Sequence, residues 1–392
     1  MISFDEALAC LRAFVSPLGS ETVALAGASH RWLAEDIVSR IASPRHTVSA
    51  MDGYAVIERG ISVGKAIPVV GEARPGHAFD DQLGIGAAVR IFTGAPLPGG
   101  ADCVIMQEYA EREGDEVRFR EGHGPSRHVR ERASDFDTGT VLVPAGRRLD
   151  PQALVAAAAA DVGAVRVHRR PQIALVATGD ELAEPGKAMD SPRAIPDSIT
   201  HALAGLIERQ GGSVVTRHRA VDDLPALEQL AGDLLASADL VVVTGGASVG
   251  ERDFAKPMFV AHGLELTFDT VAIKPGKPVW LGRAGGALVM GLPGNPTSAM
   301  VTARLLLVPL LARLQGGDGA HRWRNLPLAA MLGATGGRET FARACWDDAG
   351  LVPIGNQDSG VQGGLARADW LIRCPPGQAE LHAGTVVQAL TF

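Results

Sequence analysis

The sequence predicts a multidomain protein that joins a three-layer α/β domain to β-rich regions and a partly helical N-terminal region. Strand-like and helix-like segments alternate from residue 171 to about 315, and stretches dense in Gly and Pro with short Val/Ile runs lie on either side. The length of 392 residues also exceeds what one hydrophobic core usually serves. Two to four domains are therefore expected, and changes in composition indicate linkers near residues 45, 136–150, 168 and 316.

The N-terminal region carries helix signals. Residues 3–40 follow the period of an amphipathic helix, and Ser3 with Glu6 three residues later forms a candidate capping box. A second helix is expected in "DPQALVAAAAADVG", where Asp150 can cap the start and Gly163 can end it.

The central region alternates strands with helices. The segments "PQIALVATGDEL", "SVVTRHRAV", "DLVVVTGG" and "ALVMGLPG" are expected as strands, and the helix "PTSAMVTARLLLVPLLARLQG" follows the last of them. Such alternation predicts parallel strands connected by right-handed helical crossovers. After residue 316 the pattern returns to short strands, which predicts a small all-β module.

Composition excludes several classes of function. The net charge is −7, whereas binding of a phosphate backbone would need a concentrated basic face, so no nucleic acid is expected as a partner. The N-terminus lacks the pattern of a signal peptide and the alanine-rich run is too short to cross a bilayer, so we expect a cytoplasmic protein that does not contact a membrane. The four cysteines show no CxxC spacing, which indicates neither a zinc site nor a disulfide framework.

Three glycine-containing loops follow apolar strands: 177–182 ("ATGDEL"), 244–254 ("TGGASVGERDF") and 291–298 ("GLPGNPTS"). Ligands of open parallel sheets bind at the carboxyl ends of strands, where such loops expose backbone N–H groups. The loops match neither GxGxxG nor a P-loop, because no Lys-Ser/Thr pair follows Gly250. The pattern therefore favours an anionic ligand over ordinary nucleotide hydrolysis, although the glycines could also serve only to turn the chain.

Charged side chains accompany these loops. In "VAIKPGKPVW", Lys274 and Lys277 flank a Pro-Gly turn and could hold a phosphate or another oxyanion, or they could be ordinary surface lysines. Carboxylates follow several strands, and hard oxygen ligands of this kind hold Mg²⁺ together with substrate phosphates. These carboxylates are Asp180, Glu181, Asp222 and Asp253.

Two turns of the β-rich region carry polar side chains. Asp52 lies in the turn of "SAMDGYAV", and Thr93 lies in "RIFTGAPLPGGADCVIMQE". Taken alone, both are typical of turn chemistry.

Taken together, six stretches closely resemble the molybdopterin molybdenumtransferases, the MoeA family, to which the E domain of gephyrin also belongs. They are "SAMDGYAV", "RIFTGAPLPGGADCVIMQE", "ATGDEL", "TGGASVGERDF", "AIKPGKP" and "GLPGNPTSAMV", in the order of the family. The resemblance extends over the chain from about residue 1 to 392.

The resemblance implies an enzyme, a transferase that inserts molybdate into adenylylated molybdopterin with the help of Mg²⁺, releasing AMP and forming molybdenum cofactor. It implies an elongated N-terminal linker domain at 1–45 together with 137–168, a β-rich domain at 46–136, a MogA-like α/β domain at 169–315 and a C-terminal small β-barrel at 316–392. It also implies a homodimer with the active site between subunits, and contacts with other cofactor-biosynthesis proteins and acceptor molybdoenzymes.

The resemblance also assigns roles by position. Residues expected to act in catalysis are Asp52, Thr93, Asp135, Glu181, Asp222, Asp253 and Lys274. Residues expected to bind the pterin or its phosphate are Thr178, Gly179, Asp180, Gly245, Gly246, Ser248, Gly250, Lys277, Pro293, Gly294 and Asn295. Asp180, Glu181 and Asp253 are expected near Mg²⁺, and Arg130 and Arg132 are expected to add positive charge for molybdate.

The chain departs from the family pattern at places that we expect to face the cleft. Ile199 stands where the family usually has asparagine, Thr270 where it commonly has a basic residue, and Thr47 with Val48 where it tends to have aspartate and asparagine. The alternative hypothesis is therefore a non-catalytic or altered-specificity paralogue that binds molybdopterin or molybdenum cofactor as a carrier or scaffold.

Overall fold

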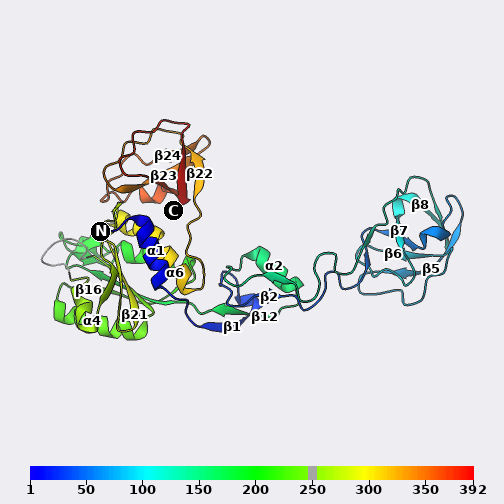
Figure 1. The fold of residues 1–392 in the computed structure, drawn as a ribbon, viewed down its shortest axis with the longest axis horizontal. Coiled ribbons are helices and arrows are strands. Elements are labelled where there is room, and N and C mark those ends of the chain that lie inside the picture. Colours follow the sequence, from blue (N-terminus) through cyan, green and yellow to red (C-terminus); the bar gives the residue numbers. More distant parts are fainter. Residues whose placement is uncertain (246–253) are drawn as a thin grey trace. The chain divides into compact units, whose positions relative to one another are not determined.

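The structure is a computed structural model that describes residues 1–245 and 254–392, and its chain divides into two compact units (Figure 1). The larger unit comprises residues 1–21, 30–34 and 166–392, and the smaller unit comprises residues 22–29 and 35–165. A multidomain protein with α/β and β parts is thereby confirmed. The four sets of domain bounds given above stay a prediction.

A mixed six-stranded sheet forms the centre of the larger unit, in the order β16-β13-β17-β21-β20-β18. Its strands are β13 (Gln172–Thr178), β16 (Ser213–Ala220), β17 (Leu240–Thr244), β18 (Glu265–Phe268), β20 (Trp280–Ala284) and β21 (Ala287–Leu292). The first four strands in the spatial order are parallel, as the alternation of strands and helices predicts.

The prediction of an all-parallel sheet is wrong for β18 and β20, which run antiparallel to their neighbours. Strands β20 and β21 are joined by Gly285 and Gly286, whose φ angles are 52° and 91°. Two consecutive residues with positive φ form the tight turn of a hairpin, and glycine adopts this conformation without steric cost. The pair "GG" is the signal for this hairpin in the sequence.

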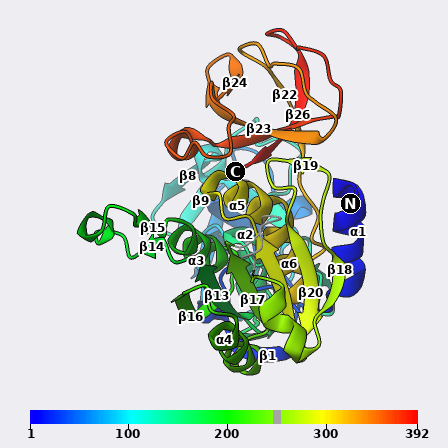
Figure 2. The ribbon, with the colours of Figure 1, turned by 90° about the vertical axis from the view of Figure 1, so that its left-hand side faces the viewer.

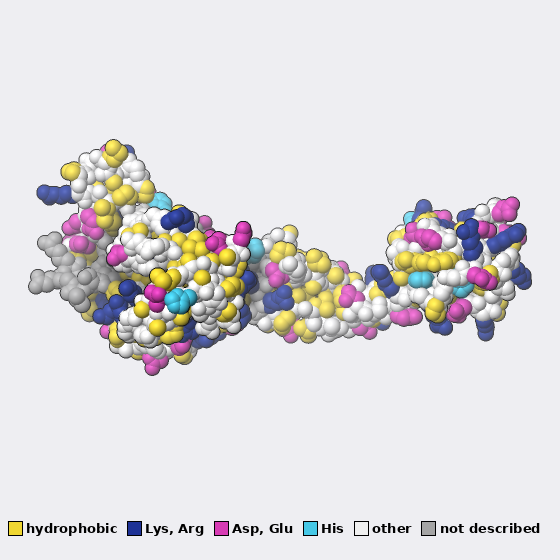
Figure 3. All heavy atoms as spheres, turned by 90° about the horizontal axis from the view of Figure 1, so that it is seen from above, with side chains coloured by type: hydrophobic (Ala, Val, Ile, Leu, Met, Phe, Trp, Pro, Cys, Tyr) yellow, Lys and Arg dark blue, Asp and Glu magenta, His cyan; other side chains and the backbone are white. Residues whose placement is uncertain are grey.

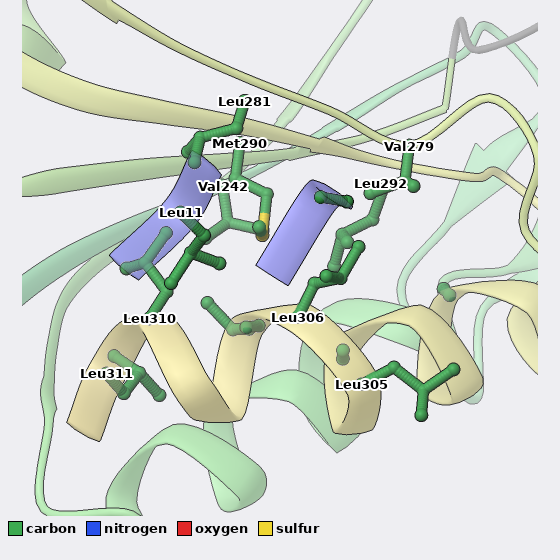
Figure 4. Packing of buried hydrophobic residues seen from close by; sticks show 14 of the residues in the cluster. Leu11, Val242, Val279, Leu281, Met290, Leu292, Leu305, Leu306, Leu310 and Leu311 are labelled. Atoms are coloured by element: carbon green, nitrogen blue, oxygen red, sulfur yellow. The ribbon is translucent and has the colours of Figure 1, made fainter. Parts of the chain in front are cut away.

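Helices cover both faces of this sheet (Figure 2). Successive residues of β17 alternate between the two layers, with Val242 in one hydrophobic cluster and Val241 in the other. In Figure 4, Leu306 and Leu310 of the long helix extend toward the sheet, where they pack in the cluster that contains Val242. The first layer contains α1 (Phe4–Phe14), α3 (Ile199–Arg209) and the long helix α5 (Pro296–Thr302), η6 (Ala303–Leu307) and α6 (Val308–Leu314), and the second contains α4 (Leu224–Ser237) and η5 (Pro257–His262). The predicted three-layer α/β domain is confirmed.

The long helix is the one described stretch, Pro296–Leu314, that has the length and composition of a membrane span. In its most apolar window, 72% of the residues are buried inside the molecule. This burial is typical of a core helix.

The N-terminal helix is much shorter than the predicted range 3–40. It has the predicted capping box, in which Ser3 Oγ accepts from the Glu6 N–H at 3.2 Å and Glu6 Oε2 accepts from the Ser3 N–H at 2.7 Å. The helix ends at Phe14 because Pro17 and the following glycine interrupt the pattern. Strand β1 (Ser20–Ala24) and the turn η1 (Leu25–Gly27) then follow, and β1 pairs with β12 (Ala164–His168).

The C-terminal part of the larger unit is the expected all-β module. Its sheet has the order β19-β23-β25-β26-β22, and β24 pairs with β23. The elements are β19 (Ile273–Lys274), β22 (Arg324–Pro327), β23 (Glu339–Asp347), β24 (Gly350–Pro353), η7 (Leu365–Arg367), β25 (Trp370–Cys374) and β26 (Val386–Thr391). Strand β19 comes from the lysine turn and pairs with the start of β23, with Lys274 opposite Thr340. The lysine turn therefore lies where the α/β part meets the C-terminal module.

The smaller unit contains the third six-stranded sheet of the described chain, in the order β7-β4-β6-β5-β9-β8, with a hydrophobic cluster on each face. Its strands are β4 (Gly53–Val56), β5 (Ile67–Ala73), β6 (Ala88–Ile91), β7 (Cys103–Met106), β8 (Ala110–Glu113) and β9 (Glu116–Phe119). Two-stranded pairs join β2 (Ile37–Val38) to β11 (Val141–Val143) and β3 (Val48–Ser49) to β10 (Val129–Arg130). On the face in Figure 3, basic and acidic side chains of this unit are interspersed.

Helix α2 (Pro151–Ala159) also belongs to the smaller unit. Asp150 caps it as predicted, because the carboxylate accepts from the Ala153 N–H at 2.7 Å. The prediction that Gly163 ends the helix is wrong: helical structure stops at Ala159, and Asp161 takes a left-handed conformation with φ 60°. The remaining short elements of the chain are η2 (Glu58–Gly60), η3 (Gln107–Tyr109), β14 (Leu182–Ala183), η4 (Ala188–Asp190) and β15 (Ile195–Pro196).

Candidate functional site

A cleft of about 870 Å³ lies in the larger unit at the carboxyl ends of β13, β17 and β21. All three predicted glycine loops and the lysine turn contribute to its wall. The predicted site residues that line it are Thr178, Gly179, Glu181, Asp222, Gly245, Lys274, Lys277, Pro293, Gly294 and Asn295. Residues that are separated by more than 100 positions in the chain therefore meet in one cavity.

Glycine is required where the strand ends meet. Gly245 has φ 95°, and a Cβ atom there would collide with the Thr178 carbonyl oxygen. A Cβ atom on Gly294 would lie 3.3 Å from the Gly245 Cα. The three loops thus approach each other through their backbones, which leaves backbone polar groups at the cavity wall.

The lysine turn is fixed against the long helix. Gly276 has φ 107°, and a Cβ atom there would collide with the methyl group of Thr302. Lys274 and Lys277 on either side of it are exposed and line the cleft. Neither lysine forms a salt bridge with a described residue, and both lie at the wall where an anionic ligand could bind.

Carboxylates share the cleft with these cations. Glu181 and Asp222 line it, whereas Asp180 is not among the described lining residues. Asp180 Oδ1 instead accepts from the Asp222 N–H at 3.0 Å, which ties the loop after β13 to the loop after β16. Among residues 1–245 and 254–392, no group of three or more His, Cys, Asp and Glu side chains is arranged to hold a metal.

This donor set still fits Mg²⁺, because Mg²⁺ is usually held by one or two carboxylates together with water and substrate phosphates. Glu181 and Asp222 supply two carboxylates to the cleft, which they share with the two lysines that could bind the phosphates of the substrate. The predicted ligand Asp253 and the predicted pterin contacts Gly246, Ser248 and Gly250 lie outside the described residues.

Asp52 and Thr93 are brought together in the smaller unit. Asp52 Oδ1 accepts from the Thr93 N–H at 2.7 Å and from the Thr93 hydroxyl at 2.8 Å. These two hydrogen bonds, the backbone bond first, lower the pKa of Asp52, and the charge of Arg90 assists. The carboxylate of Asp52 is thereby kept ionised and fixed in direction.

Asp135 is exposed in the same unit, and its N–H donates to the Ser43 carbonyl at 3.0 Å. The neighbouring Arg132 was expected to offer its charge to molybdate. Its Nη2 lies 3.0 Å from Asp137 Oδ1, and hydrogen bonds from the Thr138 N–H and then from Arg132 lower the pKa of Asp137. The charge of Arg132 is therefore partly offset within its own loop.

The C-terminal module also contributes to the cleft, which the sequence pattern does not predict. Arg338, Gln357, Asp358 and Ser359 line it, as does Ser298 at the start of the long helix. Arg338 Nη1 donates to the Ile273 carbonyl at 3.1 Å, which places a third cation beside the lysine turn. The segment "GNQDSG" carried a signal, because clustered Asn, Asp, Ser and Gly are typical of an ordered turn. Its distance in sequence from the glycine loops concealed its place in the site.

Two of the departures from the family pattern, Ile199 and Thr270, are absent from the described lining of this cleft. Ile199 is 7% exposed and belongs to the hydrophobic cluster beneath α3, so the expectation that it faces the cleft is wrong. Thr270 is absent from the described lining, and its hydroxyl donates to Asp269 Oδ1 at 3.1 Å. Thr47 lies in the smaller unit, where its hydroxyl donates to Glu131 Oε2 at 3.1 Å.

Comparison with known families covers most of the chain. Residues 2–161 match the MoeA N-terminal region (domains I and II), residues 174–313 match a probable molybdopterin binding domain, and residues 325–392 match the MoeA C-terminal region (domain IV).

Several known proteins are similar to this chain over nearly its full length. The chain is 35% identical to a molybdopterin molybdenumtransferase of Haemophilus influenzae, covering 93% of this chain and 90% of that protein. It is 32% identical to the protein of the same name from Nostoc, covering 95% and 88%, and 32% identical to molybdopterin molybdenumtransferase 2 of Mycobacterium tuberculosis, covering 94% of each.

Solved structures give the same result. Two crystal structures of a molybdopterin biosynthesis MoeA protein of Pyrococcus horikoshii superpose with TM-scores of 0.83 and 0.86, at 31% and 25% identity. The first covers 100% of this chain and 99% of the other chain, and the second covers 100% of both. With matches to both MoeA regions and to the molybdopterin binding domain between them, and with relatives above 30% identity over nearly the whole chain, the chain belongs to the MoeA family of molybdopterin molybdenumtransferases.

Proposed function

We propose that this chain inserts molybdenum from molybdate into adenylylated molybdopterin, releasing AMP and forming molybdenum cofactor. The observation that carries the proposal is the single cleft that gathers three glycine loops, the lysine turn and two carboxylates. The relatives from Haemophilus influenzae and Nostoc are named molybdopterin molybdenumtransferases, which supports the molybdenum-transfer part of this proposal.

The cations of the cleft would bind oxyanions. Lys274, Lys277 and Arg338 line one side of it, and none forms a salt bridge with a described residue. Molybdate and the phosphates of the substrate are oxyanions, and cations aimed at them also stabilise charge that develops as the phosphoanhydride breaks. We therefore assign these side chains to molybdate and to the phosphate that leaves with AMP.

Glu181 and Asp222 would orient the water that attacks the phosphoanhydride and accept its proton. They would also hold Mg²⁺, together with the predicted ligands Asp180 and Asp253. When bound, Mg²⁺ would supply positive charge to the phosphate oxygens. Without a bound cation these carboxylates would repel the anionic substrate. Their presence in a cleft with three cationic side chains therefore favours a site in which the carboxylates bind Mg²⁺ and the cationic side chains bind the substrate.

The backbone at the strand ends would hold the pterin and its phosphate. Gly245 and Gly294 keep the wall free of side chains, and Thr178 lies beneath them with 5% of its surface exposed. The same role is assigned by prediction to Gly246, Ser248 and Gly250.

We further propose a homodimer in which Asp52, Thr93 and Asp135 of one subunit complete the site of the other. Support comes from the division of the predicted residues, because these three belong to the smaller unit and the cleft belongs to the larger one. The proposed enzyme is cytoplasmic, works with other cofactor-biosynthesis proteins and passes its product to acceptor molybdoenzymes.

The test supplies the purified protein with adenylylated molybdopterin, molybdate and Mg²⁺ and measures the released AMP by chromatography. We expect release above the level of a reaction without molybdate, and loss of this release when Mg²⁺ is chelated. Binding of molybdopterin with only background AMP would refute the transferase function and support the carrier or scaffold alternative.

A further inference from the structure

Arg343, on β23, is an arginine buried in the wall behind the cleft. Its side chain is 0% exposed and forms no salt bridge with a described carboxylate. The guanidinium instead donates to three backbone carbonyls, with distances of 3.0 Å to Asn356, 3.1 Å to Asp358 and 3.2 Å to Val361. A buried charge is costly unless hydrogen bonds replace its water, so these carbonyls hold the cation in place.

The three carbonyls belong to one segment, which we name the 356–361 loop. The side chain of Gln357 in this loop binds the backbone of Arg343: Oε1 accepts from the Arg343 N–H at 2.9 Å, and Nε2 donates to the Arg343 carbonyl at 2.8 Å. The loop is thus bound to one residue of β23 through both the backbone and the side chain of that residue. Burial lowers the pKa of the Arg343 guanidinium, and the charge of Asp358 opposes this shift.

The same guanidinium connects the loop to the long helix. Thr297 is 0% exposed at the start of α5, and its hydroxyl oxygen accepts from Arg343 Nη1 at 3.5 Å. The Thr297 hydroxyl also donates to the Val361 carbonyl at 2.8 Å. Beside it, Asn295 Nδ2 donates to Ser359 Oγ at 3.4 Å.

These contacts act on the wall of the cleft. Gln357, Asp358 and Ser359 of the loop line it, and so does Asn295, the hydrogen-bond partner of Ser359. Asp358 is also held within the loop, because its Oδ1 accepts from the Gly360 N–H at 2.8 Å. The direction of a carboxylate and a hydroxyl at the edge of the cleft therefore depends on a side chain that does not itself line the cleft.

We propose that Arg343 is a positioning residue of the molybdenum-transfer site, which fixes the 356–361 loop against Thr297 and so sets the affinity for the anionic substrate. The inference rests on the function proposed above. Arginine suits the task because its planar fork presents several donors in fixed directions, which a lysine ammonium cannot do.

The test compares Arg343→Lys with Arg31→Lys. Arg31 is also buried, at 5% exposure, and binds Glu21 Oε1 at 2.5 Å and the His168 carbonyl at 2.8 Å, but it does not line the described cleft. We expect Arg343→Lys to raise KM for adenylylated molybdopterin about tenfold with little change in kcat, as expected for the loss of charged hydrogen bonds that position a binding wall. Arg31→Lys should lower the melting temperature without changing KM.

Hydrogen exchange provides a readout that does not need activity. Arg343→Lys should speed exchange of the Gly360 and Val361 amides, whereas Arg31→Lys should not. Thr297→Val keeps the guanidinium and removes the bridging hydroxyl, so it should shift KM and exchange in the same direction by a smaller factor, and it serves if Arg343→Lys does not fold.

Unchanged KM in Arg343→Lys and Thr297→Val, or equal KM shifts in Arg343→Lys and Arg31→Lys, would overturn the proposal. If the wild-type chain released no AMP, the transfer function would fail on its own. Calorimetric binding of molybdate would then decide the role of Arg343: weaker binding in Arg343→Lys but not in Arg31→Lys supports it, and equal binding rejects it.

Discussion

At the scale of single residues, the lysine turn shows how an exposed charge becomes specific. Lys274 lies on a two-residue strand that pairs with the C-terminal module, and Gly276 packs against Thr302 of the long helix. The backbone of the turn is therefore fixed on two sides, although the ammonium group itself is exposed. A fixed backbone reduces the conformational freedom that a surface lysine loses when it binds an anion.

We expect Lys274→Ala to weaken molybdate binding by about 1–3 kcal/mol, because a charged hydrogen-bonding partner is lost. Isothermal titration with molybdate measures the effect. The control is Lys65→Ala, which removes an exposed lysine that does not line the described cleft and should leave the affinity unchanged. Equal affinities in Lys274→Ala and wild type would count against the assignment.

Gly245 is a residue whose role follows from its backbone. Its φ of 95° is unfavourable for any other residue, and a Cβ atom would collide with the Thr178 carbonyl. We expect Gly245→Ala to lower the free energy of unfolding of the larger unit by about 1–3 kcal/mol. Urea denaturation measures the loss.

The matched control is Gly205→Ala in α3 of the same unit, where an added Cβ meets nothing within 4 Å. This substitution should raise stability by about 0.5–1 kcal/mol, since alanine favours a helix over glycine. A Gly245→Ala variant as stable as wild type would contradict the conformation described for this loop.

At the scale of elements, an aromatic cluster joins the N-terminal helix to the C-terminal module. The ring of His321 stacks on Phe4 at 5.8 Å and meets Trp323 edge-on at 5.5 Å. Arg373 lies over the same phenylalanine at 5.4 Å. The short connection before β22 is thereby fixed against α1, and β23, which carries Arg343, packs on the same cluster through Phe341.

This cluster predicts a pH dependence of stability. Burial first, and then the charge of Arg304 and two further arginines, lowers the pKa of His321 from 6.5 to about 4. Above pH 6.5 the imidazole is neutral in both the folded and the unfolded chain. Between 6.5 and about 4 the unfolded chain takes up a proton that the folded chain does not, so stability falls as pH falls through this window, by at most about 3 kcal/mol.

His321→Asn should lower stability at neutral pH because the ring contacts are lost, and it should also reduce the difference in unfolding free energy between about pH 7 and pH 4.5. His46→Asn, at an exposed histidine, is the control and should keep the wild-type difference. The hypothesis fails if His321→Asn and wild type lose stability equally over this interval.

At the scale of the whole molecule, the predicted site residues fall in two units. Asp52 and Thr93 belong to the smaller unit, and the cleft with Lys274 belongs to the larger one. In a two-fold symmetric dimer, each site could combine the smaller unit of one subunit with the larger unit of the other.

At a molybdate concentration that just saturates the wild type, we expect the Asp52→Asn and Lys274→Ala homodimers each to have little activity, and an exchanged equimolar mixture to regain about a quarter of wild-type activity. After exchange, half of all dimers in the mixture are heterodimers that contain one subunit of each variant. One of the two sites in each heterodimer then carries neither substitution. The control mixes Lys274→Ala with Lys277→Ala, which lie in the same turn and should not complement each other. Activity that stays at background in the first mixture would refute a site shared between subunits.

The local signals in the sequence predicted much of the fold. Capping at Ser3 and Asp150, the parallel strands β13, β17 and β21, the long apolar helix and the all-β C-terminal module all follow from propensity, periodicity and turn residues of contiguous segments. The antiparallel strands β18 and β20 were not predicted, because their direction depends on a Gly-Gly hairpin and on the neighbour available in the sheet. The helix expected over 3–40 ended early because a proline and a glycine outweighed its apolar period.

The sequence by itself determined which loops end the parallel strands, since strand ends and glycine loops are marked by residues next to each other in the chain. That alone brings the positions after β13, β17 and β21 to one edge of the sheet. Only the tertiary structure decided that Arg338, Asp358 and Ser359 complete the cleft, and that Ile199 lies in the core. The physical reason is that these positions are set by the packing of the C-terminal module and of α3 on the sheet, and such contacts between distant segments leave no periodic pattern in the chain.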